Sequence, residues 1–387
     1  MNAFYDALEQ RSPDQREADL LAALPLQVAH AQAHSEAFAH ILAGVDAHSI
    51  TSRAALAQLP VTRKSELFER QQAERARHAF GGFASMGFGP QMPRVFASPG
   101  PIYEPEGTRR DYWRMARAMF AAGFRSGELI HNCFSYHFVP AGSMMETGAH
   151  ALGCTVFPGG TGQTEQQVQA MAELRPAGYI GTPSFLKIIV EKAAEMGVAL
   201  PSLTKAMLGG EAFPPSLRDW LAERGIHAYQ CFATADLGLI AYETSARAGL
   251  VLEEQVIVEI VRPGTGDLTA TLSGPCPTGR TNTRIKGWMG RADQTTKVRG
   301  MFVHPSQVAQ VLKRFPALGR GRLVVSGEMA NDQMTLKVEA AQPSPELAQQ
   351  LGDAVREVTK LRATIEWAEP NGLPNDGKVI EDARSYR

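Results

Sequence analysis

Five short segments carry side chains that could do chemistry, and each also has an ordinary structural explanation. They are LGGEAFPP at Gly209, FATADLG at Asp236, TGDL at Asp267, GRADQTTKVRG from Gly290 and DGK at Lys378. A carboxylate can hold a hard cation or accept hydrogen bonds from neighbouring hydroxyls. An ammonium can bind a phosphate or a carboxylate. Glycine turns, turn aspartates and solvated lysines are also common without any function, so it is the order and spacing of the segments that carry information.

The composition favours a globular protein that acts on small molecules. The chain has 387 residues, of which 44% are apolar and 20% charged, and this argues against intrinsic disorder. At roughly 150 residues per domain, the length predicts two to three domains. Lys plus Arg number 39 and Asp plus Glu 40, giving a formal net charge of -1 without a long basic run. We therefore expect no nucleic-acid partner.

The cysteines and apolar segments indicate a reduced, non-membrane setting. The four cysteines form no CxxC pair and are widely spaced, so we expect buried thiols, not a disulfide framework or a thiolate zinc site. The first residues lack the pattern of a signal peptide. No apolar run reaches the roughly 18 residues of a membrane span. We expect a cytoplasmic protein without a membrane partner.

The elements that would position these segments begin with a helical lead-in over residues 1–80. Apolar residues recur there at helical spacing from Leu20 to Ile41, and LPVTRKSEL predicts a turn followed by a helix start. His30 and His34 lie one helical turn apart, a spacing that metal ligands can use. No acidic residue lies between them as in HExxH, so ordinary surface histidines are favoured.

From Arg94 onward, apolar runs alternate with helical stretches. LIHNCFS, CTVFPGG, GYIGTPS and KAMLGG predict strands, and GSMMETGAHALG, EQQVQAMAEL and FLKIIVEKAAEMG predict helices. This alternation predicts an α/β fold with mostly parallel strands. Ligands of such sheets bind in the loops where the strands end, so we expect the chemistry in those loops.

The last third of the chain predicts a second unit. VIVEIV from Val256 and LTATLSG predict further strands, and the polar segment at Asp293 predicts a domain boundary. Beyond it, VHPSQVAQVLKRF and PELAQQLGDAVREVTKL predict helices, whereas RLVVSGEM, MTLKVEA and ATIEWAE predict strands. We expect domains at 1–292 and 293–387, the second a compact α+β unit.

Taken in order, the segments resemble the phenylacetate–CoA ligases, a branch of the adenylate-forming superfamily. The resemblance runs from YDALEQRSPDQREADL to GKVIEDAR and is strongest from Gly178 to Gln307. It implies a large N-terminal AMP-binding α/β domain and a small C-terminal lid domain, joined by a hinge at Asp293.

The resemblance also implies an activity. A carboxylate attacks the α-phosphate of ATP, which gives an acyl-adenylate and pyrophosphate, and the thiol of coenzyme A then displaces AMP. We expect an AMP-forming acid–CoA ligase for an aryl or similarly small carboxylate, using ATP, Mg²⁺ and coenzyme A. A homodimer is also implied.

The resemblance assigns roles to individual residues. Lys378 is expected to bridge the carboxylate and the α-phosphate, and Asp236 to hold Mg²⁺. Ala235 stands where the family has a phosphate-binding Ser or Thr, and Thr234 is a neighbouring substitute. The remaining expected nucleotide contacts are Ser98, Gly100, Gly209, Gly210, Glu211, Phe232, Ala233, Thr234, Asp267 and Arg291.

Two further groups of residues are assigned in the same way. Lys297 and Gly300 are expected to bind coenzyme A. Aromatic rings after two strands would suit a flat aryl acid, although core packing is an equal alternative for the two phenylalanines. The expected acyl pocket consists of Tyr136, His137, Phe138, Thr182, Pro183 and Phe185.

The phosphate loop departs from the family pattern S-S-G-T-T-G-x-P. The corresponding stretch here is ASPGPIYEP, from Ala97 to Pro105, which keeps Ser98 and Gly100. Its prolines have no N–H to donate, and Glu104 adds negative charge beside a polyphosphate. Each lost charge-assisted hydrogen bond costs roughly 1.5–3 kcal/mol, so the grip on the β- and γ-phosphates should weaken while AMP binding is retained.

This departure leaves alternatives open. One is a non-catalytic relative that binds an acyl-CoA or adenylate and has lost ATP use. Another is an adenylating enzyme whose acceptor is a carrier-protein thiol. The cysteine-rich zinc segment of many relatives is reduced here to Cys276, with Thr244 at a further cysteine position, so we expect no structural zinc.

Overall fold

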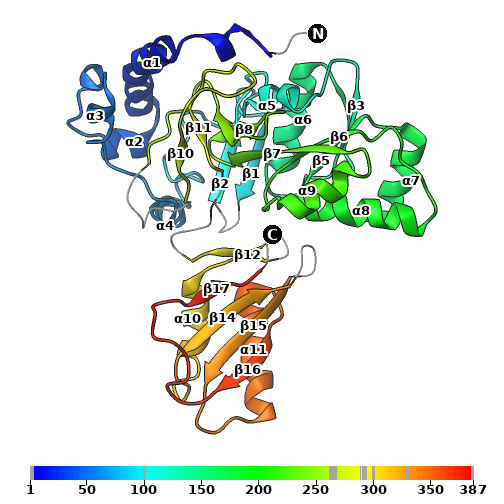
Figure 1. Cartoon of the computed structure of the whole chain (residues 1–387). Helices are drawn as coiled ribbons and strands as arrows, with labels where there is room; N and C mark the ends of the chain where they lie inside the picture. The colour runs from blue at the N-terminus through cyan, green and yellow to red at the C-terminus, as the bar shows by residue number, and fades with distance from the viewer. Residues whose placement is uncertain are drawn as a thin grey trace.

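The computed structural model of the chain describes residues 4–98, 102–260, 268–287, 289, 294–298, 301–327 and 332–384. Figure 1 shows a large upper body built from the chain up to Met289 and a smaller lower body built from residue 294 onward. The α/β architecture predicted from the alternating apolar runs is confirmed.

Helices of the large body occur in two groups. The lead-in forms α1 (Pro13–His34), α2 (Glu36–Ile41), α3 (Arg53–Leu56) and α4 (Lys64–Glu74), which confirms its helical character. The α/β region contributes α5 (Met115–Ala121), α6 (Ala141–Leu152), α7 (Thr164–Leu174), α8 (Pro183–Glu195) and α9 (Pro215–Ala222).

Strands of the large body form a hairpin and a wide sheet. The hairpin consists of β1 (Arg94–Ser98) and β2 (Ile102–Glu106). The described part of the sheet has nine strands in the order β10-β11-β9-β8-β7-β6-β5-β3-β4. Their bounds are β3 (Leu129–Asn132), β4 (Thr155–Phe157), β5 (Gly178–Gly181), β6 (Lys205–Leu208), β7 (His227–Thr234), β8 (Gly238–Glu243), β9 (Leu250–Leu252), β10 (Thr271–Leu272) and β11 (Arg284–Ile285).

The sheet changes character at β7. Strands β4, β3, β5, β6 and β7 pair in parallel, and from β7 to β10 every pairing is antiparallel. Because side chains alternate along a strand, each parallel strand contributes side chains to two hydrophobic cores, one on each face of the sheet. Ile180 and Met207 pack with α5 and α6, whereas Tyr179 and Ala206 pack with α7, α8 and α9. Both faces of the parallel region are therefore covered, as such sheets require.

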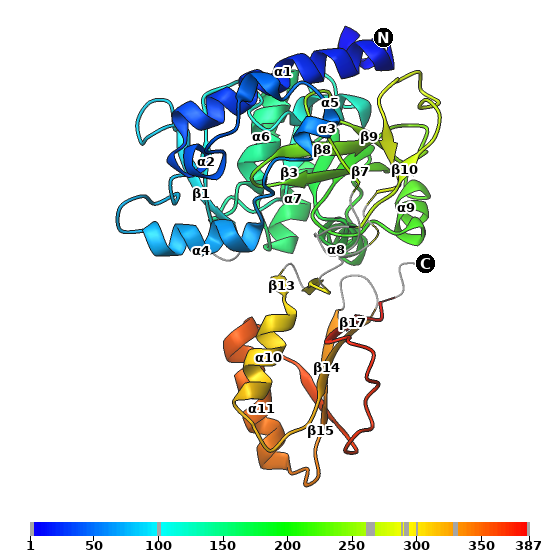
Figure 2. The ribbon, with the colours of Figure 1, turned by 90° about the vertical axis from the view of Figure 1, so that its left-hand side faces the viewer.

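The small body is an α+β unit, as predicted. Strands β14 (Gly321–Ser326), β15 (Gln333–Glu339), β16 (Thr364–Ala368) and β17 (Ile380–Asp382) form a sheet in the order β16-β15-β14-β17. Helices α10 (Pro305–Lys313) and α11 (Pro345–Thr359) cover one face of it (Figure 2). The hairpin of β12 (Thr296–Val298) and β13 (Met301–Val303) lies at the end nearest the large body.

One strand prediction is wrong. Residues 256–260 of VIVEIV have no regular secondary structure, and LTATLSG contributes only the short β10. Residues 256–260 pair with none of the described strands, although Val258 still packs against the cluster of Ala241, Leu250, Leu252 and Ile285. Among the described helices, none is long and apolar enough to span a bilayer.

Candidate functional site

The loops predicted to carry chemistry meet at one edge of the parallel sheet. Asn132 at the end of β3 pairs with Ile180, and Gly181 at the end of β5 pairs with Leu208 at the end of β6. The strands therefore end at the same level, and the loops that follow them lie side by side. This is the edge where open α/β sheets bind ligands.

The glycine turn after β6 brings the backbone close to its neighbours. Gly210 has a φ of +76°, a left-handed conformation that favours glycine. A Cβ added at Gly209 would lie 3.1 Å from Cys231 Sγ. The Glu211 carboxylate accepts a hydrogen bond of 2.5 Å from Ser184 Oγ at the start of α8. A helix N-terminus favours such a negative charge, so Glu211 fixes this turn against α8.

Thr182, Pro183 and Phe185 have clear structural roles. The Thr182 side chain caps α8 by accepting from the Phe185 N–H, and Pro183 occupies the first helical turn. Phe185 packs against the core between the sheet and α8. Core packing is thus the better supported alternative for Phe185, and a pocket role for these residues stays a prediction.

Two aromatic residues in the loop after β3, Tyr136 and Phe138, lie in different environments. The Tyr136 hydroxyl donates to Glu146 Oε2 at 2.8 Å and accepts from Asn132 Nδ2 at 2.8 Å, so the phenol is fixed to α6. Burial and the adjacent Glu146 raise the pKa of Tyr136. Phe138 is 82% exposed with a left-handed φ of 62°, which rules out core packing. His137 beside it is also exposed.

Asp236 lies in the tight turn between β7 and β8. Thr234 Oγ1 accepts from the Leu237 N–H at 3.2 Å, and Trp113 Nε1 donates to the Ala235 carbonyl at 3.2 Å. The pairing of β7 with β8 shifts register between Phe232 and Ala233. Such bulges redirect side chains beside functional sites. The turn holds the Asp236 carboxylate half-exposed at the sheet edge.

The phosphate-loop segment forms the β1–β2 hairpin. Ser98 pairs with Ile102 across its end, and the Ser98 hydroxyl, 4% exposed, donates to Glu104 Oε1 at 3.2 Å. Glu104 itself is 7% exposed. Burial raises the pKa of Glu104 to about 7, which a nearby ammonium, that of Lys64, opposes.

Lys64 is the functional candidate that the sequence reasoning missed. It is the first residue of α4, and its Nζ lies 3.7 Å from Glu104 Oε1 and 3.6 Å from Asp236 Oδ1. The ammonium thus joins the hairpin to the β7–β8 turn. The available signal was a lysine at the helix start in LPVTRKSEL, which gave no indication of these partners.

The donors at this edge fit a magnesium ion that arrives with a polyphosphate. Mg²⁺ typically takes one or two carboxylates, substrate phosphates and several waters. Asp236 offers a carboxylate that is 41% exposed. In the described part of the chain, no group of three or more His, Cys, Asp or Glu side chains could hold a metal alone. The metal would need phosphate oxygens to complete its coordination.

A lysine of the small body contacts this edge of the large body's sheet. Lys297 on β12 donates from Nζ to the Gly210 carbonyl at 2.6 Å. Burial lowers the pKa of Lys297, and the nearby Glu211 opposes that effect. Arg384, two residues after β17, donates to the Lys297 carbonyl at 2.8 Å and thereby fixes β12 to the segment that follows β17. Lys297 and the glycine turn are therefore brought together.

Lys378 is not brought to that turn by any described contact. Its side chain is exposed, and its backbone N–H donates to Asp376 Oδ1 at 3.1 Å. Gln294 binds the backbone on both sides of it: Gln294 Nε2 donates to the Gly377 carbonyl at 2.9 Å, and Val379 N–H donates to Gln294 Oε1 at 2.7 Å. The loop that carries Lys378 is thus fixed beside the chain segment that links the two bodies.

Some sequence predictions fall on positions that the structure leaves undescribed. The nucleotide contacts Gly100, Asp267 and Arg291, the hinge Asp293 and the coenzyme A contact Gly300 lie outside the described residues. Their roles, and a domain boundary at Asp293, stay predictions.

Hydroxyl groups surround Cys276 at the position where the resemblance implies a cysteine-rich zinc segment in related proteins. Cys276 Sγ lies 3.4 Å from Thr244 Oγ1 and 3.1 Å from Thr278 Oγ1. These hydroxyls replace the thiolates that a zinc ion prefers. The expectation that no structural zinc is bound stays a prediction.

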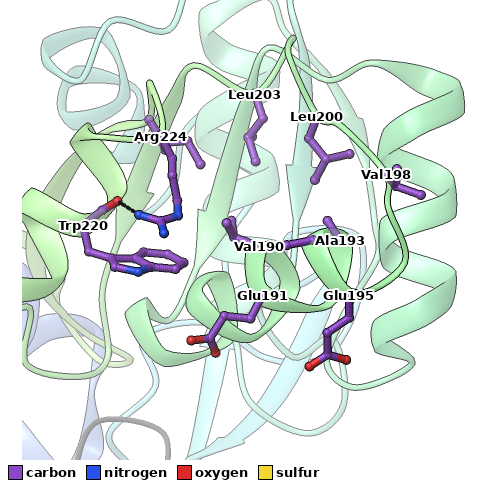
Figure 3. Close-up of a pocket in the computed structure, with 11 residues that line it drawn as sticks. Val190, Glu191, Ala193, Glu195, Val198, Leu200, Leu203, Trp220 and Arg224 are labelled. Carbon is purple, nitrogen blue, oxygen red and sulfur yellow. Dashed lines mark hydrogen bonds between the residues drawn. The ribbon is translucent and has the colours of Figure 1, made fainter.

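A groove of about 760 Å³ lies at the opposite edge of the sheet (Figure 3). Leu203 precedes β6 and Ile226 precedes β7, so the groove adjoins the amino ends of these strands. Arg224 stacks on Trp220, with 3.9 Å between the guanidinium carbon and the ring centroid. Ligands of parallel sheets bind at the other edge, and we assign no function to this groove.

Comparison with known proteins identifies relatives over most of the chain. The phenylacetate–CoA ligase of Thermus thermophilus is 29% identical over 345 residues, which cover 78% of this chain and 76% of that protein. The phenylacetate–CoA ligase of Aromatoleum evansii is 28% identical over 380 residues, covering 86% and 84% respectively. The chain is a homologue of the phenylacetate–CoA ligases. Residues 300–383 of this homologue also match the family described as AMP-binding enzyme C-terminal domain.

Solved structures confirm the fold of this phenylacetate–CoA ligase homologue. A 2-hydroxyisobutyryl-CoA ligase in its thioesterification state, with 2-HIB-AMP and CoA, superposes with a TM-score of 0.82 at 22% identity, covering 100% of this chain and 93% of that one. The same ligase in its postadenylation state gives a TM-score of 0.68, covering 98% and 92%. Over the whole chain, the superposition on the former structure is therefore the better of the two.

Proposed function

We propose that the chain is an AMP-forming acid–CoA ligase that activates an aryl or similarly small carboxylate with ATP and transfers the acyl group to coenzyme A. The observation that carries this proposal is the similarity to phenylacetate–CoA ligases over most of the chain. Two carboxylates and a cation at the same sheet edge, Glu211 and Lys297 at the glycine turn and Asp236 at the β7–β8 turn, support it, because both half-reactions need carboxylates and cations around a phosphate.

The first half-reaction joins the acid to AMP. An oxygen of the substrate carboxylate attacks the α-phosphorus of ATP, and the bond to the β-phosphate oxygen breaks, so pyrophosphate leaves. Lys378 would bind the carboxylate and α-phosphate oxygens together and hold them in line. Asp236 would hold Mg²⁺, which supplies charge neutralisation on the phosphates. Asp267 would accept from the ribose hydroxyls, and Arg291 would contact the nucleotide.

The second half-reaction forms the thioester. The sulfur of coenzyme A attacks the acyl carbon, the bond to the AMP oxygen breaks, and the thiol proton is lost. The small domain would turn about Asp293 between the two steps. Lys297 and Gly300 would then line the approach of coenzyme A. The hydrogen bond from Lys297 to the Gly210 carbonyl supports an arrangement in which Lys378 is away from the glycine turn.

The decisive test is pyrophosphate release from ATP and Mg²⁺ without coenzyme A, measured with a panel of aryl and short aliphatic carboxylates. We expect acid-dependent release and, once coenzyme A is added, an acyl-CoA product detectable by mass spectrometry. If folded protein that binds AMP releases no pyrophosphate with any acid of the panel, the proposal is overturned in favour of a non-catalytic binding protein. An acyl group on a carrier-protein thiol but not on coenzyme A would change the acceptor.

A variant separates the two half-reactions. Lys378→Ala should abolish adenylate formation but leave thioester formation from a supplied acyl-adenylate largely intact. Equal loss of both half-reactions would count against the role given to Lys378. A cytoplasmic location and a homodimer are further proposals, which cell fractionation and light scattering would test.

A further inference from the structure

The altered phosphate loop has fewer hydrogen-bond donors and one more carboxylate than the family pattern. The loop lacks donors, because prolines replace residues with an N–H, and it adds the carboxylate of Glu104. A carboxylate beside the β- and γ-phosphates would repel them. If the chain uses ATP, some other group must supply positive charge at this hairpin.

Lys64 is placed to supply that charge. Its Nζ lies within 4 Å of carboxylates from two different parts of the site, at 3.7 Å from Glu104 and 3.6 Å from Asp236. Both distances exceed the usual 2.7–3.2 Å of an N–H···O hydrogen bond. The Lys64 side chain is 50% exposed. The ammonium therefore lies at ion-pair distance from two carboxylates, and solvent can still reach the side chain.

The position of Lys64 is set by the helix that carries it. Gln71, about two turns further along the same face of α4, is 1% exposed and binds the backbone of Tyr103 twice. Tyr103 N–H donates to Gln71 Oε1 at 2.8 Å, and Gln71 Nε2 donates to the Tyr103 carbonyl at 3.0 Å. Arg75 stacks over the Tyr103 ring at 5.4 Å. Helix α4 is therefore fixed along β2, with its first residue beside Glu104.

Electrostatics favour transfer of the ammonium to a phosphate. Desolvation keeps the pKa of Glu104 near 7, which limits its negative charge at neutral pH. A polyphosphate carries more charge than either carboxylate and accepts charge-assisted hydrogen bonds. The long flexible stem of lysine allows its ammonium to move between such acceptors.

We propose that Lys64 binds the β- and γ-phosphates of ATP in this chain and stands in for the donors that the altered hairpin has lost. Glu104 and Asp236 hold the ammonium in place before the nucleotide arrives. The proposal rests on the proposed use of ATP and gives that site a further binding residue from the N-terminal helices.

Binding measurements test this independently of turnover. Lys64→Gln should weaken the binding of ATP and of inorganic pyrophosphate by about 10- to 100-fold, the value of one charge-assisted hydrogen bond. Binding of AMP should change by less than about twofold, because AMP lacks the β- and γ-phosphates. Isothermal titration calorimetry with ATP, pyrophosphate and AMP gives the three values.

The matched control is Arg63→Gln. It removes a positive charge from the neighbouring position, where the side chain is half-exposed and faces Glu66 at 3.9 Å. We expect no selective loss of ATP binding in this variant. Lys64→Arg should retain most of the affinity, because it keeps the charge. Glu104→Gln should tighten ATP binding, since the competing carboxylate is gone.

The outcomes separate two failures. If the unaltered protein releases pyrophosphate and Lys64→Gln keeps its affinity for ATP, the role of Lys64 is wrong and the proposed function stands. Equal weakening of ATP and AMP binding would also overturn the proposal, because it would indicate damage to the whole site. If the unaltered protein binds AMP but neither ATP nor pyrophosphate, both proposals fail.

Discussion

Two ionic clusters in the large domain have opposite construction. In the first, the buried Glu9 carboxylate accepts from the Tyr242 hydroxyl at 2.7 Å and from Arg280 Nε at 2.9 Å. In the second, Lys64 lies 3.7 Å from Glu104 and 3.6 Å from Asp236, and its side chain is half-exposed. The charged groups of the first cluster are paired by short hydrogen bonds. In the second cluster the contacts are longer, and the Lys64 ammonium is accessible to a ligand.

The difference follows from what each cluster joins. Glu9 lies in the N-terminal segment and binds side chains from β8 and from the stretch before β11. Near it, Arg16 Nε donates to Glu254 Oε2 at 3.0 Å. A buried charge is tolerated when paired and hydrogen-bonded, and these pairs fasten the lead-in to the sheet. The Lys64 cluster joins helix α4, the β1–β2 hairpin and the β7–β8 turn, where under our proposal a phosphate replaces its contacts.

The largest expected effect is on stability, at the first cluster. Glu9→Gln removes the charge that compensates Arg280 in a buried setting. The free energy of unfolding should fall by about 3–5 kcal/mol, as for one partner of a buried ion pair. Urea denaturation followed by circular dichroism measures this.

The control for Glu9 is an exposed ion pair of the lead-in. Arg53 Nε lies 2.6 Å from Glu17, and both side chains are about two-fifths exposed. Glu17→Gln should cost less than about 1 kcal/mol. Equal costs for Glu9→Gln and Glu17→Gln would contradict the structural role of the first cluster.

The next effect is on activity, at the second cluster. Asp236→Asn should reduce pyrophosphate release about 10²- to 10³-fold, the usual loss when one transition-state electrostatic contact is removed. Its melting temperature should stay within a few degrees, because the carboxylate is 41% exposed. A large loss of stability with normal activity per folded molecule would place Asp236 with the first cluster instead.

The third prediction concerns pH. Burial raises the pKa of Glu104 to about 7 from an ordinary value of 4.5. The folded state therefore binds this proton more tightly than the unfolded state, and stability falls as pH rises from about 5 to above 7. The fall can reach about 3 kcal/mol for this group.

Glu104→Gln should flatten this part of the stability profile. Urea denaturation of both proteins at pH 5, 6, 7 and 8 gives the comparison. If the two profiles run parallel, Glu104 does not titrate in this range.

The two clusters also mark what the sequence could and could not predict. Strands β3, β4, β5 and β6 coincide with the predicted apolar runs, because apolar runs and helical stretches follow a local pattern, whereas β7 has no counterpart among the predicted strands. Glu104 was recognised as an unusual charge, but its partner was not. Lys64 on helix α4 contacts Glu104 on the β1–β2 hairpin, and that contact depends on which face of β2 is buried.

The face of β2 could not be deduced from its residues. In IYEPE, Ile102, Glu104 and Glu106 share the buried face. A rule of apolar residues inside and polar residues outside gives no such arrangement. Glu106 is satisfied there by two hydrogen bonds from Arg94 Nη1 on the paired strand. The error at 256–260 has a related cause, because an apolar strand pattern does not tell whether a partner strand is available.

The smallest expected effect lies where the small domain meets the sheet edge. Lys297 resembles Lys64 in reaching this edge from another element, but it makes a short bond of 2.6 Å to the Gly210 carbonyl. Lys297→Ala removes a contact that holds the present arrangement of the domains. Thioester formation from a supplied acyl-adenylate should therefore fall about tenfold, the value of roughly 1.4 kcal/mol.

Adenylate formation should be nearly unchanged in Lys297→Ala, because in the proposed mechanism that step would use another arrangement of the small domain. Lys337→Ala is the matched control, since Lys337 pairs with Glu366 at 3.1 Å on the surface of the same domain. Single-turnover measurements of each half-reaction distinguish the two variants. A loss confined to adenylation would show that Lys297 acts with Lys378 in the first step, and would make the hydrogen bond to Gly210 a resting contact.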